Sequence, residues 1–564
     1  MSNSHRPLQA HLGKYQTAIA AAHADIVQQK ILERIWQHDH TVWKPEPTEI
    51  TNRLGWLHSP AVMQKSIAEI AAFVDEVRAA GFTHALLLGM GGSSLAPEVF
   101  RFTFGVAPGY LDLAVLDSTH PGAVLQHARR LDLSKTLFIV STKSGGTVET
   151  FSFFKYFYNE LLKIAGKEKA GEHFVAITDP GSGLADTAKE YRFRKTFLND
   201  PNIGGRYSAL SYFGLVPAAL LGVDIGKLLA RAQNAASDKS DGNIAVQLGA
   251  AMGELAKAGR DKVTFLTSPA IASFGAWVEQ LIAESTGKEG KGILPVLEEE
   301  PGAPEVYAED RSFVYLRLNG DDTHTARIKA LANAGHPVVQ IDLQDTYDLG
   351  AEFFRWEIAT VIAGQRLGIN PFDQPNVESA KVLARKTVAE FQEKGRLPEL
   401  APTAIESGLT AYADFPARSI KQALKDFLAL ARTEQPRSYV ALQAYLAPNH
   451  ATDEALQLLA AKVRDEYQLA ATIGYGPRFL HSTGQLHKGD AGNGLFIQCT
   501  GNATEDAAIP NKAGEENSSM SFGTLLLAQA LGDRQALLDN QRSVLRVDLG
   551  KNVVEGLKRL QEML

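Results

Sequence analysis

The chain has 564 residues, 45% of them hydrophobic and 21% charged, which is enough for two or three domains with sizeable cores. The net charge of −7 and the lack of a Lys/Arg-rich block argue against nucleic acid as a partner, and the single cysteine, Cys499, excludes an intrachain disulfide framework and fits a reducing compartment. No apolar run approaches the roughly 18 residues that span a bilayer, so we expect a cytoplasmic protein with no membrane segment.

The first part of the chain predicts helices followed by a parallel sheet. Residues 16–36 and 61–80 carry apolar side chains at helical spacing. Short apolar runs follow, most of them separated by helical patterns, and the strands that we expect are 84–88, 113–116, 137–140, 174–177 and 195–198. This alternation is typical of a doubly wound α/β domain. We expect it to span 56–236, after a helical lead-in at 1–55.

The same alternation restarts after the polar segment 237–242, which predicts a second α/β domain over 237–390. Its expected strands are 263–266, 313–318 and 338–341, and its expected helices include 271–284 and 352–367. The last part, 391–564, is expected to be a C-terminal α/β and helical region. There we expect a helical pattern from 378 to about 432, interrupted at Pro398, Pro402 and Pro416, then a βαβ unit over 439–473, a strand at 495–498 and helices to the end.

The polar turn between the strand 137–140 and the next helix has the composition of an anion site. The residues Ser141 to Thr147 offer hydroxyl groups, the Lys143 ammonium and backbone N–H groups at a helix start, where the macrodipole favours negative charge. Phosphate is the anion that we expect. An ordinary loop whose hydroxyl side chains cap the helix would explain the turn equally well when it is considered alone.

Two glycine-containing turns extend this pattern. Gly89 to Ser94 resembles a dinucleotide fingerprint only in part, since Ser94 stands where the third glycine is expected and Asp117 matches the acidic partner poorly. We interpret it as a second loop for phosphate or sugar hydroxyls, with a plain glycine turn as the alternative. In the other turn, Arg206 follows two glycines and could stabilise an oxyanion, unless it only binds a helix end or a surface carboxylate.

Three further stretches carry groups suited to proton transfer. Glu284 ends an apolar helix, where desolvation would give it the raised pKa of a general base, whereas Glu279 on the same helix is expected to be solvated. A proline-bracketed turn presents Gln374, with Lys381 about two helical turns further on. His481 lies in a polar, glycine-flanked stretch after a strand. The sequence has no metal-ligand pattern, and we expect neither a metal nor a cofactor.

Together these residues resemble the phosphoglucose isomerase (glucose-6-phosphate isomerase) family, built from two sugar-isomerase (SIS) domains. The matching stretches are 89–97, 140–150, 204–208, 284–288, 370–381 and 480–485. The stretches 479–489 and 522–533 look most like the isomerase half of bifunctional transaldolase/glucose-6-phosphate isomerase proteins, although a transaldolase barrel of roughly 200 residues would not fit into this chain.

The resemblance implies an isomerase that interconverts D-glucose 6-phosphate and D-fructose 6-phosphate through a cis-enediol. Arg206 would stabilise the enediolate, Glu284 would move the proton between C2 and C1, and His481 and Lys381 would assist ring opening. The implied substrate-binding residues are Gly92, Ser93, Thr142, Lys143, Ser144, Thr147, Gly205 and Gln374. The resemblance also implies a homodimer, in which His481 could come across the interface. The alternatives are an isomerase of mannose or amino sugar phosphates and a non-catalytic sugar-phosphate-binding protein.

Three features depart from the family pattern. Gly145 and Gly146 replace hydroxyl residues in the phosphate turn, so more of the contact should come from backbone, and Thr286 stands where asparagine is common. The third is chain order, because the His481 stretch follows the segment 370–381 instead of preceding it. Either a permuted C-terminal unit returns His481 to the same place, or another residue opens the ring. Since geometry and not chain order defines a site, we expect the first.

Overall fold

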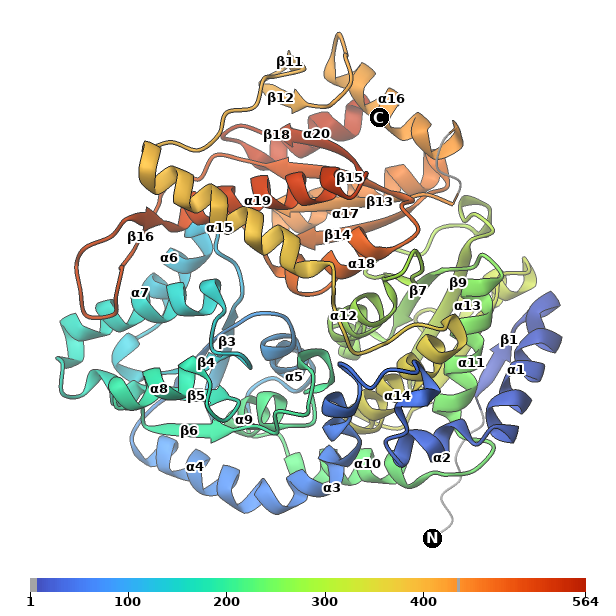
Figure 1. Cartoon of the computed structure of the whole chain (residues 1–564), viewed down its shortest axis with the longest axis horizontal. Coiled ribbons are helices and arrows are strands. Elements are labelled where there is room, and N and C mark those ends of the chain that lie inside the picture. Colours follow the sequence, from blue (N-terminus) through green and yellow to red (C-terminus); the bar gives the residue numbers. More distant parts are fainter. Residues whose placement is uncertain (1–7, 434–436) are drawn as a thin grey trace.

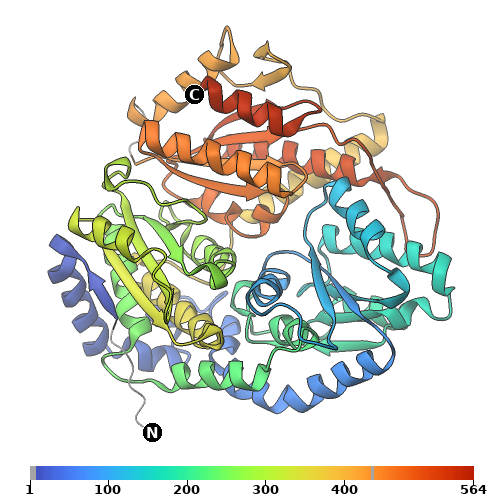
Figure 2. The same cartoon turned by 180° about the vertical axis from the view of Figure 1, so that it is seen from behind.

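The computed structural model describes residues 8–433 and 437–564, which form three α/β lobes around a common centre (Figure 1). Each lobe contains one large sheet, and the three lobes follow one another along the chain from blue through green to red. The view from behind shows the same three-lobed outline (Figure 2). The expected α/β class with doubly wound parallel sheets is confirmed. No helix in the described part of the chain has the length and apolar character needed to cross a membrane.

The first lobe holds a five-stranded parallel sheet in the order β3-β2-β4-β5-β6. Its strands are β2 (His84–Gly89), β3 (Asp112–Leu116), β4 (Thr136–Ser141), β5 (Phe174–Thr178) and β6 (Lys195–Leu198). Its helices are α4 (Ile67–Ala79), α5 (Leu95–Phe104), α6 (Pro121–Arg130), α7 (Val148–Ala165), α8 (Gly183–Glu190) and α9 (Tyr212–Leu220). The strand order reverses between β2 and β4, which is where open α/β sheets bind ligands.

The second lobe holds the order β1-β10-β9-β7-β8, in which the N-terminal β1 is an antiparallel edge strand. Its strands are β1 (Gln9–His11), β7 (Lys262–Thr267), β8 (Leu294–Val296), β9 (Arg311–Leu318) and β10 (Val338–Leu343). The helices on this side are α1 (Gln16–Gln28), α2 (Ile31–Trp36), α3 (Ser59–Met63), α10 (Ile225–Ser237), α11 (Ile244–Lys257), α12 (Phe274–Thr286), α13 (Thr325–Asn333) and α14 (Leu349–Leu367). The N-terminal segment therefore completes the second sheet.

The third lobe holds a six-stranded sheet in the order β11-β12-β18-β15-β13-β14. Its strands are β11 (Ala404–Glu406), β12 (Leu409–Tyr412), β13 (Tyr439–Tyr445), β14 (Ala470–Tyr475), β15 (Gly494–Thr500) and β18 (Ser543–Asp548). Its helices are α16 (Ile420–Thr433), α17 (His450–Tyr467), α18 (Gly484–Gly489), α19 (Phe522–Asp539) and α20 (Val553–Met563). Helix α15 (Val377–Lys394) lies across α19 (Figure 1), and the small ribbon of β16 (Ala508–Ile509) and β17 (Met520–Ser521) adjoins α7.

Three secondary-structure expectations were wrong. The pattern predicted as helical from 378 to 432, with interruptions at prolines, also contains the hairpin β11–β12, whose turn includes Gly408 with a φ of 78°. The segment predicted as helices to the end contains strand β18, which lies between β12 and β15. The helix predicted over 16–36 ends at Gln28 and restarts after Lys30, whose φ is 53°.

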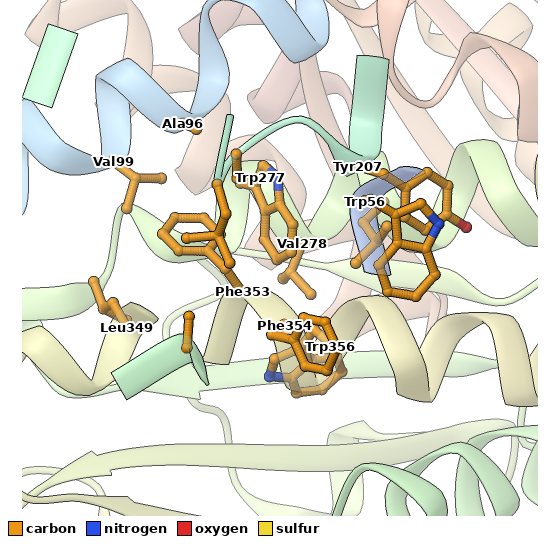
Figure 3. Close-up of a cluster of buried hydrophobic side chains, with 14 of the residues drawn as sticks. Trp56, Ala96, Val99, Tyr207, Trp277, Val278, Leu349, Phe353, Phe354 and Trp356 are labelled. Atoms are coloured by element: carbon orange, nitrogen blue, oxygen red, sulfur yellow. The ribbon is translucent and has the colours of Figure 1, made fainter. Parts of the chain in front are cut away.

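A shared core joins the first and second lobes beneath the site. Figure 3 shows Trp277 and Phe353, from α12 and α14, beside side chains of α5. The rings of Trp277 and Phe353 meet edge to face with centroids 4.6 Å apart, and Trp56 stacks on Tyr207 at 5.2 Å. Such aromatic pairs stabilise a core beyond the area that they bury. Because Arg206 directly precedes Tyr207, this core fixes the position of the arginine turn.

Candidate active site

The two loops expected to bind phosphate lie side by side at the reversal of the first sheet. Gly89 and Ser141 are paired in register across β2 and β4, and the Ser141 hydroxyl donates to the Ser93 carbonyl at 3.2 Å. The Thr147 hydroxyl bonds to Thr142 at 2.9 Å instead of capping α7. No side-chain hydrogen bond therefore caps the N-terminus of the 18-residue helix α7 in the described structure. Free backbone N–H groups at a helix start are what an anion site requires.

Lys143 is the member of this turn whose surroundings differ from the expectation. Its ammonium donates to the Asp179 carboxylate and, at 2.9 Å, to the carbonyl of Pro201. Burial raises the pKa of Asp179, and the bond to Lys143 only partly opposes that shift. Much of the Lys143 charge is therefore directed at Asp179, so hydroxyl and backbone groups must supply more of any phosphate contact.

Arg206 is only 3% exposed and makes contacts with residues of two segments beside the two loops. Its guanidinium lies 3.1 Å from the Glu284 carboxylate. Its other partners are the Ser285 hydroxyl, the Gln374 amide oxygen and the Pro371 carbonyl, each at 2.8 Å, and the Asp373 carbonyl at 3.0 Å. A planar guanidinium held at this many points has little freedom, and this is the requirement for a preorganised oxyanion stabiliser.

The Arg206 turn and the Gly89–Ser94 loop are pressed together. A Cβ on Gly92 would lie closer than 3.0 Å to the backbone of Gly205, a separation that real Cβ atoms essentially never show. The Ser208 hydroxyl also donates to the Gly92 carbonyl at 3.2 Å. Glycine at position 92 therefore lets Arg206 approach the phosphate loops.

A buried amide links the carboxylate to the histidine. The Gln280 side chain donates both to Glu284 at 3.1 Å and to the backbone carbonyl of His481 at 2.7 Å. Gly91 packs against the same histidine, since a Cβ there would lie 2.6 Å from its carbonyl oxygen. The structure thus returns His481, from the third lobe, to the loops of the first lobe, in spite of its unusual position in the chain.

The imidazole of His481 is paired with a buried carboxylate that we did not single out from the sequence. Its Nε2 lies 3.1 Å from Glu149, which is 4% exposed and also accepts from the Gln529 amide at 2.7 Å. Burial alone would raise the pKa of Glu149, but the charge and hydrogen bond of His481, with a smaller effect of Lys381, hold it below its ordinary value. Lys381 is thus close enough to act on this pair electrostatically.

The turn that carries Gln374 is held from both sides. Lys288 donates to the backbone carbonyl of Asp373 and, at 2.8 Å, to its carboxylate. Burial, and then the neighbouring charge of Arg206, lower the pKa of Lys288 to about 8. On the other side the Gln485 amide oxygen accepts from the Asn376 backbone at 2.9 Å.

One sequence expectation about this region was wrong. Glu279 was expected to be solvated, but it lies half-buried in a cavity of about 140 Å³ between the three lobes, lined also by Glu298, Asp453 and Arg478. Burial raises the pKa of Glu279 to about 8, partly opposed by Arg478.

Asp117, which the sequence showed to be a poor match to a ribose-binding acid, forms an ion pair with Arg478 at 3.3 Å.

Most of the predicted site residues are thus brought together, although their roles stay predictions. The residues joined by the contacts above are Gly92, Ser93, Gly205, Arg206, Glu284, Gln374 and His481. Thr142 and Thr147 bond to each other in the adjoining turn, and the exposed Ser144 accepts from the Gly146 backbone at 3.3 Å. The residues that sequence reasoning missed are Glu149, Gln280, Ser285, Lys288 and Gln529. A local signal existed only for Glu149, an acid in the first turn of a helix that follows a polar turn.

Within the described residues, no group of three or more His, Cys, Asp or Glu side chains is arranged to hold a metal ion. The groups that converge in the site are organic acids, bases and a guanidinium. They suit proton transfer next to a developing oxyanion.

Comparison with known proteins identifies the family. The model of the family described as phosphoglucose isomerase matches residues 60–291. The glucose-6-phosphate isomerase of Limosilactobacillus reuteri is 30% identical over 386 residues, which cover 58% of this chain and 84% of the relative. That of Rubrobacter xylanophilus is 29% identical over 379 residues, which cover 58% of this chain and 87% of the relative.

Solved structures share the fold. The crystal structure of a hypothetical protein from Thermus thermophilus has a TM-score of 0.58 at 24% identity and covers 68% of this chain and all of that one. A glucose-6-phosphate isomerase from Chlamydia trachomatis has a TM-score of 0.57 at 19% identity, over 66% of this chain and 86% of that one. The fold therefore defines an α/β protein with two or more doubly wound sheets. The match to the Limosilactobacillus reuteri relative shows that the chain belongs to the phosphoglucose isomerase family.

Proposed function

We propose that the chain is an aldose–ketose isomerase that interconverts D-glucose 6-phosphate and D-fructose 6-phosphate. The observation that carries the proposal is the 3.1 Å approach of the Glu284 carboxylate to the Arg206 guanidinium, beside two loops suited to phosphate. A movable proton, a fixed oxyanion stabiliser and a phosphate anchor are what this isomerisation needs. The family membership and the names of its relatives support the same activity.

The proton balance assigns a role to each group. Glu284 takes the proton from C2 of the open-chain aldose, the C1 carbonyl oxygen gains negative charge, and Arg206 stabilises it. Moving the hydroxyl proton from O2 to O1 and returning the first proton to C1 gives the ketose, with no net oxidation. The phosphate loops hold the substrate in place, so that binding energy far from the reacting carbons orients them.

Ring opening is assigned to the histidine pair. His481 donates a proton to the ring oxygen as the bond between C1 and the ring oxygen breaks, and the anomeric hydroxyl loses its proton to solvent and becomes the C1 carbonyl. The Glu149 carboxylate at 3.1 Å stabilises the imidazolium form before transfer. Lys381 adds positive charge near the same groups. Gln374 orients the guanidinium of Arg206 through its bond at 2.8 Å.

Several finer expectations stay predictions of the sequence. These are the cytoplasmic location, the homodimer, the absence of a cofactor, the domain boundaries and the likeness to bifunctional transaldolase/glucose-6-phosphate isomerase proteins. Preference for glucose over mannose or amino sugar phosphates is also untested. Assays with fructose 6-phosphate and mannose 6-phosphate in parallel would separate these substrates.

Replacing Glu284 with glutamine tests the proposal. The amide keeps the size of the side chain but cannot accept the proton, so we expect turnover of fructose 6-phosphate to fall at least roughly 100-fold. Deuterium exchange from solvent into the substrate should fall equally, while protection against thermal unfolding by inorganic phosphate is retained. Wild-type turnover or exchange in Glu284→Gln would remove the carboxylate from the reaction.

A further inference from the structure

The third lobe has its own reversal of strand order, separate from the reversal in the first lobe. Strand β13 is followed by β14 on one side and β15 on the other, so the sheet reverses between β13 and β15. Across this point Gln443, Gln498 and Arg546 form one register row over β13, β15 and β18. Open parallel sheets bind ligands at such reversals, and here a polar row crosses one.

Arg546 carries a charge that the surrounding protein leaves poorly compensated. The residue is 7% exposed, and its Nε meets no acceptor in the part of the chain that the structure describes. Its guanidinium lies over the ring of Tyr412 at 5.6 Å. Asp548 lies nearby, but its oxygens accept from the Thr500 hydroxyl at 3.1 Å and the Gly550 backbone at 2.9 Å. Burial accordingly lowers the pKa of Arg546, and Asp548 only partly opposes the shift.

A second guanidinium faces the same region. Arg534, on α19, is 8% exposed, and its Nε also lacks an acceptor among the described residues. It pairs at 3.0 Å with Asp414, whose side chain is 57% exposed and marks the side nearest to solvent. The charge of Arg534 lowers the pKa of Arg546 further. The two like charges therefore act on each other, an arrangement that an anion would stabilise.

Neutral polar groups complete the row. Both amide atoms of Gln443, the amide oxygen of Gln498 and the hydroxyl of Tyr445 are buried without a hydrogen-bond partner in the described chain. All three side chains are at most 2% exposed. A buried group left unsatisfied is rare in native proteins, and several at one place require an explanation.

We propose that this face of the third lobe binds a small hydroxylated oxyanion between Arg534, Arg546 and the amides of Gln443 and Gln498. The guanidinium groups would bind the anionic end, phosphate or carboxylate, in the geometry that suits both. The amides and the Tyr445 hydroxyl would exchange hydrogen bonds with the ligand's hydroxyl groups. Separation of Arg534 from Asp414, the exposed member of the pair, gives the ligand its way in.

The site lies beside the catalytic histidine pair but does not belong to it. Helix α19 carries Arg534 and, five residues earlier, Gln529, which binds Glu149 at 2.7 Å. The Tyr445 hydroxyl lies within the influence of Asp533, Arg546 and Glu149, with Asp533 the strongest. A bound anion would therefore act on the same helix that positions Glu149, and we expect it to change the rate of isomerisation.

The test must separate this site from the phosphate turn. Gly146→Asp places a carboxylate in that turn, where a Cβ would meet only the Ser144 hydroxyl at 3.9 Å, and so repels a bound phosphate there. In this background, thermal unfolding is followed with inorganic phosphate, glycerol 3-phosphate or citrate, each against sodium chloride at equal ionic strength. We expect at least one probe to raise Tm by roughly 3 °C or more when it is well above its Kd.

Adding Arg546→Met to the Gly146→Asp protein should abolish the rise in Tm. Adding Arg559→Met instead, which removes an exposed arginine from the same lobe, should leave the rise unchanged. Without a probe, Arg546→Met should unfold at the wild-type temperature or above, since it replaces a poorly compensated buried charge. Should it fail to fold, Arg534→Met is measured in its place. A probe response that persists without Arg546, or no response to any of the three probes, would overturn the proposal. A response to inorganic phosphate or glycerol 3-phosphate would identify phosphate as the anionic group. A response to citrate alone would identify carboxylate.

Discussion

Two carboxylates on one helix have opposite surroundings. Glu284 lies 3.1 Å from Arg206 and accepts from Gln280, whereas Glu279 faces a cavity between the lobes in which Glu298 adds negative charge. Five residues turn an α-helix by roughly 140° from its starting face, so the two side chains belong to different environments. The helix presents one acid to the guanidinium and keeps the other protonated near neutral pH.

Glu279 should make stability depend on pH. Because its pKa is raised from 4.5 to about 8 in the folded state, its protonated form contributes stability that is fully present below pH 4.5 and is lost as the pH rises through about 8. Arg478 and Glu298 act on it with opposite signs, and Asp453 lines the same cavity. Glu279→Gln, which stays neutral, should therefore be more stable than the wild type at pH 8.5, by about 1–3 kcal/mol for a half-buried group.

Urea unfolding at pH 5 and pH 8.5 measures this difference. The gap between the two proteins should shrink towards pH 5, where wild-type Glu279 is also neutral. Glu298→Gln serves as a comparison from the same cavity. A gap of equal size at both pH values would show that Glu279 does not change its charge between them and would contradict the raised pKa.

Residues with local signals were predictable, and those defined by distant contacts were not. Arg206 and Glu284 adjoin glycine turns that can be recognised in the sequence. Gln529 gains its significance only from Glu149, 380 positions away in the chain, and no local pattern reports such a contact. Lys143 shows the converse, since its place in a polar turn was evident but its bond to Asp179 was not.

At the scale of the elements, buried strands were found and marginal ones were missed. Strands β2, β4 and β5 are continuous apolar runs covered on both faces, which is a strong sequence signal. The missed strands are β1, β8, β11, β12, β16, β17 and β18. Apart from β18 they are only two to four residues long, and pairing with neighbours determines them more than their own composition does.

The contact between two loops sets the geometry of the site, and one methyl group should disturb it. Gly92→Ala would force the Gly89–Ser94 loop away from Gly205, because the obstructing atoms are backbone and cannot rotate aside. We expect a loss of roughly 1–3 kcal/mol of stability together with a lower kcat as Arg206 moves. Gly205→Ala is the matched control, since its Cβ would meet nothing within 4 Å.

Thermal unfolding and steady-state kinetics of the two variants measure this effect. Only Gly92→Ala should lose several degrees in Tm. Equal Tm values for Gly92→Ala and the wild type would mean that the two loops separate at little cost and do not fix Arg206.

At the scale of the whole molecule, the third lobe completes the site within a single chain. His481 contacts Glu149 of the first lobe and Gln280 of the second. The lobe is held there by contacts such as the Gln485 amide, which donates to the Gly287 carbonyl at 2.9 Å. The expected supply of His481 across a dimer interface is therefore not needed for this geometry, whatever the oligomeric state.

Mixing two inactive variants distinguishes the arrangements. Glu284→Gln lacks the proposed base and His481→Gln lacks the proposed ring-opening acid, so a site made by one chain stays defective in every mixture of the two. Were each site shared between two chains, random pairing in a dimer would restore roughly a quarter of wild-type activity. We expect co-expressed or co-refolded mixtures to show no more turnover of the cyclic sugar phosphate than the average of the two variants. Recovery well above that average would show that His481 acts in a neighbouring copy, and that the contact with Glu149 within the chain is not the one used in catalysis.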